Sequence, residues 1–280
     1  METCTCSGKA AGLGAPLPRL EAFVNIAPSR LHAALCLCAL TAAARAEVLP
    51  PLTQGDSAIH AGWRYVGFPK KKADIPDTLF EAGQVDGQAA IRITTAASYG
   101  TLVHDLEESA PGRLMWRWRL DQALTGGKSA PDLQTKAGDD AALKVCVMFD
   151  HPLDRVPFFE RTVLRIARST SGEALPAATV CYVWDSAHTA GLQGANPYTR
   201  RVRYISLRGS ETPAGQWANE SRDLGQDFVT LFGDELPKGD QTPRGALPRV
   251  RTVLLGADSD NTASRSSGWV ADLRWGAASP

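Results

Sequence analysis

The sequence predicts a mainly β protein, an antiparallel jelly-roll-like β-sandwich with one or two short helices. Apolar and polar residues alternate with a period of two over many short segments, which is the pattern of half-buried strands. Gly, Pro and Asp separate these segments and favour turns. The 280-residue chain also contains seven Trp, all beyond residue 60, as expected for a large aromatic core.

Nine segments show the pattern of a strand bounded by turn residues. In chain order they are residues 63–68, 90–94, 101–106, 114–120, 143–149, 179–184, 201–207, 250–257 and 269–275. Many short strands with turn signals between them are typical of an antiparallel sandwich.

Two segments break this rhythm. Residues 224–232 carry apolar side chains at helical spacing. Asn219 or Ser221 can cap the start of this helix, and Gly233 can end it. A second helix is predicted from the spacing of Phe159, Val163 and Ile166, entered from Pro157. Both helices are expected to pack against the sandwich, with their apolar stripes in the core.

Residues 30–46 have the features of a signal peptide. Arg30 leads into an apolar run at residues 31–44, and residues 44–46 form the small-x-small pattern that signal peptidase recognises. The run is shorter than the roughly 20 residues that a membrane-spanning helix needs. The sequence therefore predicts cleavage near Ala46, a periplasmic or secreted location, and no stable membrane insertion of the mature protein.

The rest of the chain divides into three parts. Residues 1–29 are Gly, Ala and Pro-rich and are interpreted as a non-native N-terminal extension. Residues 47–59 form a linker, and residues 60–276 form one β-sandwich domain, a size at which all-β folds occur as a single unit.

Charge excludes one class of partner. The chain has 30 Lys plus Arg and 30 Asp plus Glu, a formal net charge of zero. A nucleic-acid-binding surface requires a clustered basic face, so no nucleic-acid partner is expected.

Cys146 and Cys181 are the two cysteines that follow residue 46. Both fall in predicted strands, and in an oxidising compartment they could pair. Alternatively, they are buried free thiols that behave as small apolar residues. The sequence leaves both alternatives open.

A candidate metal site lies between the last two predicted strands. Asp258, Asp260 and Asn261 occupy the turn, and Asp272 follows on the last strand. Ca²⁺ takes about six to eight oxygen ligands, which such side chains supply. These four residues therefore predict a structural Ca²⁺ site. The alternative is a polar loop whose Asp and Asn side chains cap backbone amides.

A candidate ligand-binding face follows from the alternation of side chains. Arg117 and Arg119 share the face of their strand opposite to its two tryptophans. Lys144 also lies on the non-core face of its strand, and Trp184 and Asp185 end another strand. These residues are expected to line a groove for a glycan or another polar small molecule. The alternative is that this face meets solvent.

Carboxylates near strand ends suggest a third type of site. Asp139, Asp140, Asp185 and Asp258 could supply the pair that glycoside hydrolysis requires. Their alternative role is turn formation. No motif in the chain assigns a catalytic residue.

An ordered set of short motifs resembles a bacterial family of unknown function, DUF3047. The motifs, which span roughly residues 60–276, are Trp116-Arg117-Trp118, Gly138-Asp139-Asp140-Ala141, Val147-Met148-Phe149-Asp150, Tyr182-Val183-Trp184-Asp185, Gly215-Gln216-Trp217, Glu220-Ser221-Arg222-Asp223, Asp227-Phe228, Phe232-Gly233 and Asp258-Ser259-Asp260-Asn261-Thr262. The resemblance implies a secreted or periplasmic protein and supplies no activity. The length and strand-rich pattern also look similar to jelly-roll carbohydrate-binding modules, which is an analogy of fold.

Three functional hypotheses follow. The first is a non-catalytic exported envelope protein that binds a glycan or similar polar ligand, steadied by Ca²⁺. The second is a polysaccharide hydrolase with paired carboxylates facing each other in a cleft. The third is a structural envelope assembly protein, which would show an exposed apolar patch and no groove.

Overall fold

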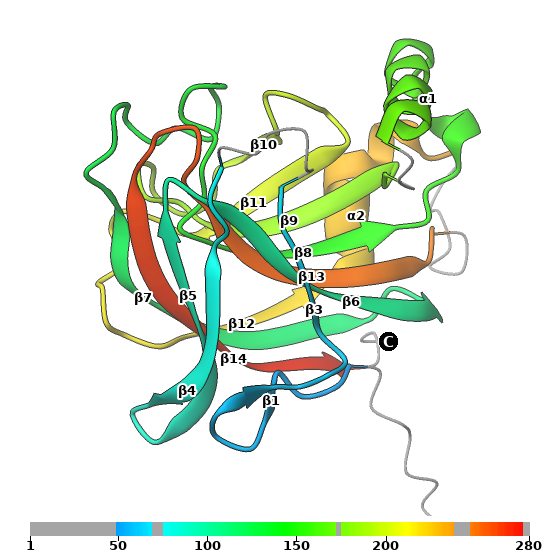
Figure 1. The fold of residues 1–280 in the computed structure, drawn as a ribbon. Coiled ribbons are helices and arrows are strands. Elements are labelled where there is room, and N and C mark those ends of the chain that lie inside the picture. The colour runs from blue at the N-terminus through cyan, green and yellow to red at the C-terminus, as the bar shows by residue number, and fades with distance from the viewer. Residues whose placement is uncertain (1–48, 69–74, 172–174, 238–246, 277–280) are drawn as a thin grey trace, which may run out of the picture. The chain divides into compact units, whose positions relative to one another are not determined.

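The computed structural model describes residues 49–68, 75–171, 175–237 and 247–276. The predicted extension and signal peptide lie outside these residues. Within the described residues, two β-sheets pack face to face, as Figure 1 shows. The predicted mainly β, antiparallel sandwich with two helices is confirmed.

The larger sheet has seven strands in the order β10-β11-β9-β8-β13-β6-β3. Their bounds are β3 Arg64–Val66, β6 Tyr99–Ser109, β8 Leu143–Phe149, β9 Ala178–Trp184, β10 Gln193–Ala195, β11 Val202–Arg208 and β13 Val250–Asp258. Neighbours pair antiparallel except β9 and β11, which are parallel. The sequence did not indicate this pair, because alternation shows which side chains face the core but not the direction of the neighbouring strand.

The smaller sheet has five antiparallel strands in the order β12-β7-β14-β5-β4. Their bounds are β4 Leu79–Val85, β5 Gln88–Ala96, β7 Arg113–Thr125, β12 Ala218–Asp223 and β14 Arg265–Gly276. A separate two-stranded ribbon is formed by β1, Thr53–Gln54, and β2, Ala58–Ile59. All nine predicted strands are present. The five that the pattern missed are the ribbon strands and the edge strands β4, β10 and β12, which have one neighbour and need less apolar surface.

The core lies between the two sheets. On β7, Trp116 and Trp118 face inward and are at most 1% exposed. Their ring centroids lie 5.2 Å from that of Tyr182 and 5.5 Å from that of Trp184, respectively. Such tilted and edge-on aromatic contacts add stabilisation beyond the buried area. The alternation of side chains along β7 therefore places both tryptophans in the middle of this core.

Helix α2, Leu224–Phe232, follows β12 directly and closes one end of the core. Phe228 and Phe232 are fully buried, so the predicted apolar stripe of this helix is confirmed as core. The predicted end of the helix at Gly233 is confirmed, but the predicted N-terminal caps are wrong. Asp223 caps the helix by accepting a hydrogen bond from the backbone N–H of Gln226, because the two expected caps, Asn219 and Ser221, are paired within β12. A single 3₁₀ turn, η2, Gly233–Glu235, continues from α2.

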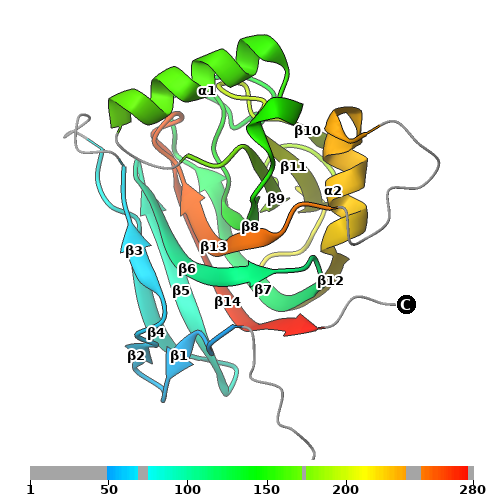
Figure 2. The same cartoon turned by 90° about the vertical axis from the view of Figure 1, so that its right-hand side faces the viewer.

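Helix α1, Phe158–Ser171, is entered through the 3₁₀ turn η1, Leu153–Arg155. Its existence is confirmed, but its expected packing is wrong. Phe159, Val163 and Ile166 are between 52% and 77% exposed. In Figure 2, α1 lies along the top of the view. Neither described helix has the length and apolar content that crossing a membrane requires.

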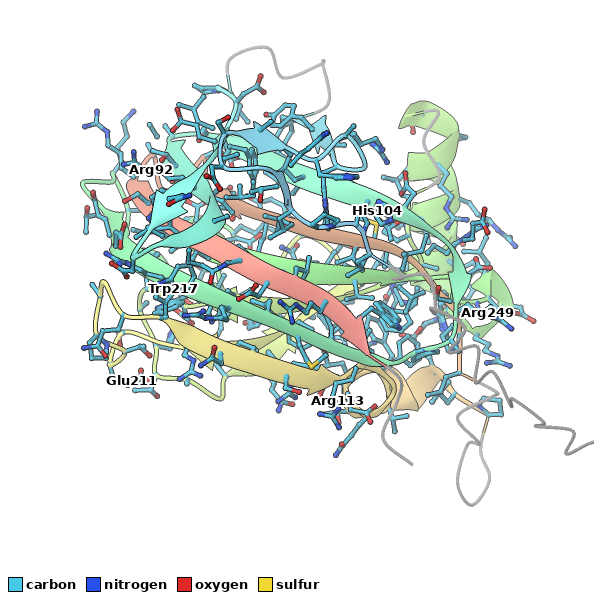
Figure 3. All side chains as sticks on the ribbon, turned by 90° about the horizontal axis from the view of Figure 1, so that it is seen from below. Arg92, His104, Arg113, Glu211, Trp217 and Arg249 are labelled. Atoms are coloured by element: carbon cyan, nitrogen blue, oxygen red, sulfur yellow. A yellow bond between two sulfur atoms is a disulfide. The ribbon has the colours of Figure 1, made fainter. Side chains whose placement is uncertain are left out.

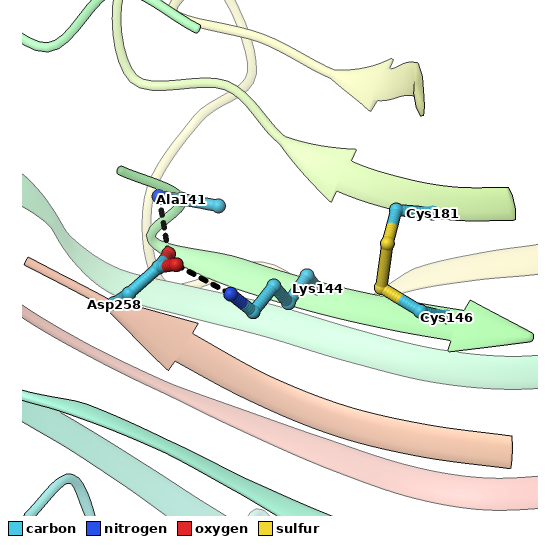
Figure 4. The surroundings of a disulfide bond; sticks show 5 residues. All are labelled: Ala141, Lys144, Cys146, Cys181 and Asp258. Atoms are coloured by element: carbon cyan, nitrogen blue, oxygen red, sulfur yellow. Dashed lines mark hydrogen bonds and ion pairs between the residues drawn. A yellow bond between two sulfur atoms is a disulfide. The ribbon is translucent and has the colours of Figure 1, made fainter. Parts of the chain in front are cut away.

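Cys146 on β8 and Cys181 on β9 form a disulfide, drawn in Figure 4. They lie directly opposite each other in the antiparallel pair, with Cα atoms 4.1 Å apart. Of the two alternatives that the sequence left open, the structure shows the bridge. Both side chains belong to a second apolar cluster, on the side of the larger sheet that faces away from the smaller one.

Candidate functional site: an acidic pocket beside the disulfide

The acidic residues of the site come from two segments that adjacent strands bring together. Asp258 ends β13, and Asp140 lies just before β8. Because β8 and β13 pair antiparallel, the end of one meets the start of the other. The backbone N–H of Ala141 donates to Asp258 Oδ1 over 2.8 Å, which fixes this carboxylate where β13 ends and β8 begins, as Figure 4 shows.

Three carboxylates converge where β13 ends and β8 begins. One oxygen from each of Asp140, Asp258 and Asp260 lies within 4.8 Å of the other two. Oxygens that share one Ca²⁺ lie about 2.3–2.6 Å from the ion, and hence up to roughly 5 Å from each other. The three side chains therefore have the spacing of a partial Ca²⁺ coordination shell.

Two of these carboxylates also hold the loops together. Asp140 accepts hydrogen bonds from the backbone N–H of Thr262 over 2.7 Å and from that of Asn261 over 3.2 Å. Asp258 Oδ2 lies 2.5 Å from Lys144 Nζ in a largely buried ion pair. The capping role expected for a polar loop is therefore present, and it coexists with the convergence of carboxylates.

Burial and mutual repulsion change the acidity of the cluster. The pKa of Asp139 is raised to about 7, chiefly by burial and then by the charge of Asp258. The same two causes raise the pKa of Asp260 to about 6. Burial alone would lower the pKa of Lys144. The charges of Asp258, Tyr99 and Asp139 and the hydrogen bond to Asp258 together raise this pKa instead, so the lysine is firmly protonated. The site thus contains four carboxylates, including Asp140, and one ammonium group, and it favours a further positive charge or a proton.

A small cavity of about 60 Å³ opens beside this cluster, and Asp139, Lys144 and Asp258 line it. Asn196 lines it as well and donates from Nδ2 to Asp139 Oδ2 over 2.5 Å. Tyr198, two residues further on, is 58% exposed. The site therefore combines charged groups, an amide and an exposed aromatic ring.

The hydroxyl of Tyr198 fixes its ring beside the cluster. Tyr198 Oη lies 2.9 Å from Asn261 Oδ1 and 2.9 Å from the carbonyl oxygen of Lys136. Tyr198 and Asn196 were not among the residues predicted from the sequence. Both lie in the loop between β10 and β11. Only the Asn-Pro-Tyr turn at residues 196–198 could have drawn attention to an aromatic residue in a loop.

The predicted metal residues are divided by the structure. Asp258 and Asp260 come together, and Asn261 lies beside them with its Nδ2 donating to Asp140. Asp272 lies on β14 in the smaller sheet, 3.6 Å from Arg117 Nη1. A shift in register interrupts β14 there, and the positive φ of Asp272 turns the side chain toward Arg117 instead. Its place in the set is taken by Asp140.

The predicted groove of Arg117, Arg119 and Lys144 is not formed. The arginines lie on the outer face of the smaller sheet, whereas Lys144 belongs to the larger one. Arg117 lies 4.9 Å from the ring centroid of Trp217, and Arg119 ion-pairs with Asp86 over 2.6 Å. Figure 3 labels Trp217 on this side of the molecule. Partners just outside the strands of the smaller sheet therefore engage both guanidinium groups.

Trp184 and Asp185 also differ from expectation. Trp184 is 1% exposed, because its position on β9 points between the sheets, so it cannot form a rim. Asp185 is 2% exposed and accepts hydrogen bonds from the backbone N–H groups of Ala187 and His188. Asp185 therefore shapes a turn, the alternative role that the sequence analysis gave it.

The fold and the site define a jelly-roll-like β-sandwich with an acidic pocket at one end of its larger sheet. The chain belongs to the family described as "Protein of unknown function (DUF3047)", whose model matches residues 61–274. This confirms the family resemblance.

Several solved carbohydrate-binding modules of family 29 are similar to the chain. A lysine-to-alanine variant of CBM29-2 is 11% identical, with 82% of this chain and 91% of that chain covered and a TM-score of 0.31. A glutamate-to-arginine variant of a family 29 module is 10% identical, with 81% and 89% covered and a TM-score of 0.30. TM-scores this low carry no argument about the ligand of this chain. Among curated proteins, none matches the chain.

Proposed function

We propose that this protein is a non-catalytic, exported jelly-roll that binds a glycan or similar polar ligand beside its acidic pocket. The observation that carries the proposal is the exposed ring of Tyr198, held next to Asp139 and Asn196. Sugars present both apolar C–H faces and hydroxyl groups. An aromatic ring suits the first, and a carboxylate or amide suits the second.

We further propose that a structural Ca²⁺ binds Asp140, Asp258 and Asp260. The spacing of their oxygens and the excess of carboxylates over Lys144 support this. An ion at this point would tie the loop after β13 to the segment before β8. It would thereby stabilise the two segments that form the ligand site.

The disulfide supports export. Disulfides persist in oxidising compartments and are rare in the cytosol. We therefore propose a periplasmic or secreted protein, cleaved near Ala46. We also propose that the protein has no nucleic-acid partner, and the balanced charge of the chain supports this.

Thermal melting of the full chain with soluble glycans tests the ligand proposal, because a ligand at 100 times its Kd stabilises the native state by about 2.7 kcal/mol. A glycan that raises the Tm of the wild type should have no effect on Tyr198→Ala. Phe158→Ala, which removes an even more exposed aromatic ring on α1, is the matched control and should respond like the wild type. No shift with any neutral or acidic glycan would overturn glycan binding.

A second candidate, a polysaccharide hydrolase, is favoured by one observation. Asp139, with its pKa raised to about 7, lines the same cavity as the ion-paired Asp258. A protonated acid beside an ionised carboxylate is the arrangement that glycoside hydrolysis uses. The test is release of reducing ends, which the wild type would produce and Asp139→Asn would not. The binding proposal predicts no release from either protein.

A further inference from the structure

Helix α1 presents an unusual apolar surface. Four of the eight exposed large apolar side chains in the described residues belong to it: Phe158 at 76%, Phe159 at 77%, Val163 at 52% and Ile166 at 60% exposure. We call these four residues the α1 stripe. In α1, only Leu164 is a buried large apolar residue. A contiguous exposed apolar surface of this kind usually marks an interaction site.

The helix is attached to the body along a different line of residues. Glu160, Leu164 and Arg168 recur every four residues and lie on one face. Glu160 Oε2 lies 2.5 Å from Arg201 Nη2, Leu164 packs in a small apolar cluster, and Arg168 donates from Nε to the carbonyl oxygen of Leu175 over 2.8 Å. These three contacts fix the rotation of the helix, so the α1 stripe stays exposed.

The charge around the α1 stripe is basic. Residues 153–171 contain four arginines and two carboxylates. One of the carboxylates, Glu160, is neutralised by its ion pair with Arg201. Arg155 and Arg165 make no ion pair among the described residues and remain available for an external anion.

We propose that α1 is an interfacial helix that binds the surface of an anionic lipid bilayer through the α1 stripe. A helix with aromatic and aliphatic residues on one face and arginines on another lies in the plane of the bilayer interface, with its apolar side chains below the headgroups. The arginines then meet acidic headgroups. This attachment is peripheral, because 14 residues of helix extend only about 21 Å.

A second copy of the chain fits this surface less well. Two copies that met through the α1 stripe in a symmetric dimer would each present the same residues to the other. Both copies would then bring Arg155, Arg161 and Arg165 to one interface, where these like charges repel. An anionic bilayer satisfies the apolar and the basic groups together, whereas self-association satisfies only the apolar ones.

Vesicle flotation of the full chain tests the proposal. The protein should float with vesicles of phosphatidylcholine mixed with phosphatidylglycerol, and much less with phosphatidylcholine alone. The double variant Phe159→Ser/Ile166→Ser should lower the partition coefficient about tenfold or more. Leu79→Ser/Val229→Ser, which alters two exposed apolar residues elsewhere, is the matched control and should bind like the wild type.

The charge contribution has its own pair of variants. Arg155→Gln/Arg165→Gln should weaken binding to the anionic vesicles about tenfold, and added salt should reduce this difference. Arg92→Gln/Arg265→Gln removes the same charge from the smaller sheet and should have little effect. Equal Tm values would show that all variants are folded.

Three results would overturn the proposal. The first is the absence of binding to anionic vesicles. The second is equal binding to both kinds of vesicle. The third is equal binding by the α1 variants and their controls, which is also what lipid binding through residues 31–44 would produce, because all of these proteins share that segment.

Discussion

Arg201 and Glu235 form a buried, bidentate ion pair. Arg201 Nη1 lies 2.8 Å from Glu235 Oε2, and Arg201 Nη2 lies 2.6 Å from Glu235 Oε1. The side chains are 5% and 1% exposed. Arg201 also binds Glu160, so one guanidinium group connects α1 to the turn after α2.

Replacing Arg201 with Met should lower the free energy of unfolding by about 3 kcal/mol, because it leaves the charge of Glu235 buried without its main partner. Arg64→Met is the matched control, since its pair with Asp105 is more than half exposed. That change should cost less than about 1 kcal/mol. Urea unfolding measures both values, and equal losses would contradict the prediction.

Acid should destabilise the protein through the same pair. Burial raises the pKa of Glu235, but hydrogen bonds from Arg201 and His151, together with the charges of Arg201 and Arg203, outweigh burial and lower the pKa to about 2. The folded-state pKa thus lies below the unfolded value of 4.5, so the contribution is complete above pH 4.5 and is lost as the pH falls toward 2. In Glu235→Gln this part of the acid dependence of Tm should be missing. An unchanged profile between pH 4.5 and pH 2 would contradict it.

Asp139 should produce the opposite dependence. Its folded-state pKa of about 7 lies above the unfolded value of 3.8, so the native state binds more protons between these two pH values. Stability should therefore fall as the pH rises from 4 to 7, and Asp139→Asn should flatten this slope. Asp56→Asn, at an exposed turn, serves as the control and should keep it. Melting curves across the pH range measure the slopes.

Ca²⁺ should raise the Tm of the wild type, and Asp260→Asn should abolish the rise. Asp272→Asn is the sharpest control, because the sequence grouped this residue with the metal site and the structure places it beside Arg117. The variant should respond to Ca²⁺ like the wild type. The rise should be larger at pH 8 than at pH 5, since protons compete for Asp260, whose pKa is about 6. Equal Tm values for the wild type in Ca²⁺ and in chelator would remove the metal site.

Removing the disulfide in Cys146→Ala/Cys181→Ala should cost about 4 kcal/mol, the chain-entropy value for cysteines separated by 35 residues. The wild type with reductant in urea should approach the same midpoint. Unfolding of the variant at the midpoint of the oxidised wild type would show that the bridge adds no stability.

Two phenylalanines should differ sharply on replacement with Ala. Phe228 is fully buried in α2. Its replacement with Ala should lower the free energy of unfolding by about 3–5 kcal/mol, because it leaves a cavity. Phe159 is 77% exposed in α1 and should change stability by no more than about 0.5 kcal/mol. Urea unfolding compares them, and similar losses would mean that the α1 stripe is covered in solution.

The period of two predicted much of the architecture. In β7 it placed Trp116 and Trp118 inside and Arg117 and Arg119 outside, and the structure has this arrangement. The helical spacing at residues 224–232 likewise predicted α2 and its buried face. Such patterns are local, because a residue and its near neighbours in the chain report the same core–solvent boundary.

Local sequence patterns do not predict contacts between distant segments of the chain. Asp140 accepts from Thr262, 122 residues away, and Tyr198 meets Asn261, 63 residues away. No local pattern marks such a meeting, since it depends on which strands become neighbours and where their connections cross. Thus the sequence by itself determined the fold class, the strands of the interior and the acidic turn at Asp258. Only the tertiary structure decided which carboxylates share that turn, that Trp184 is core, and that α1 keeps its apolar face exposed, because these depend on what packs against each side chain.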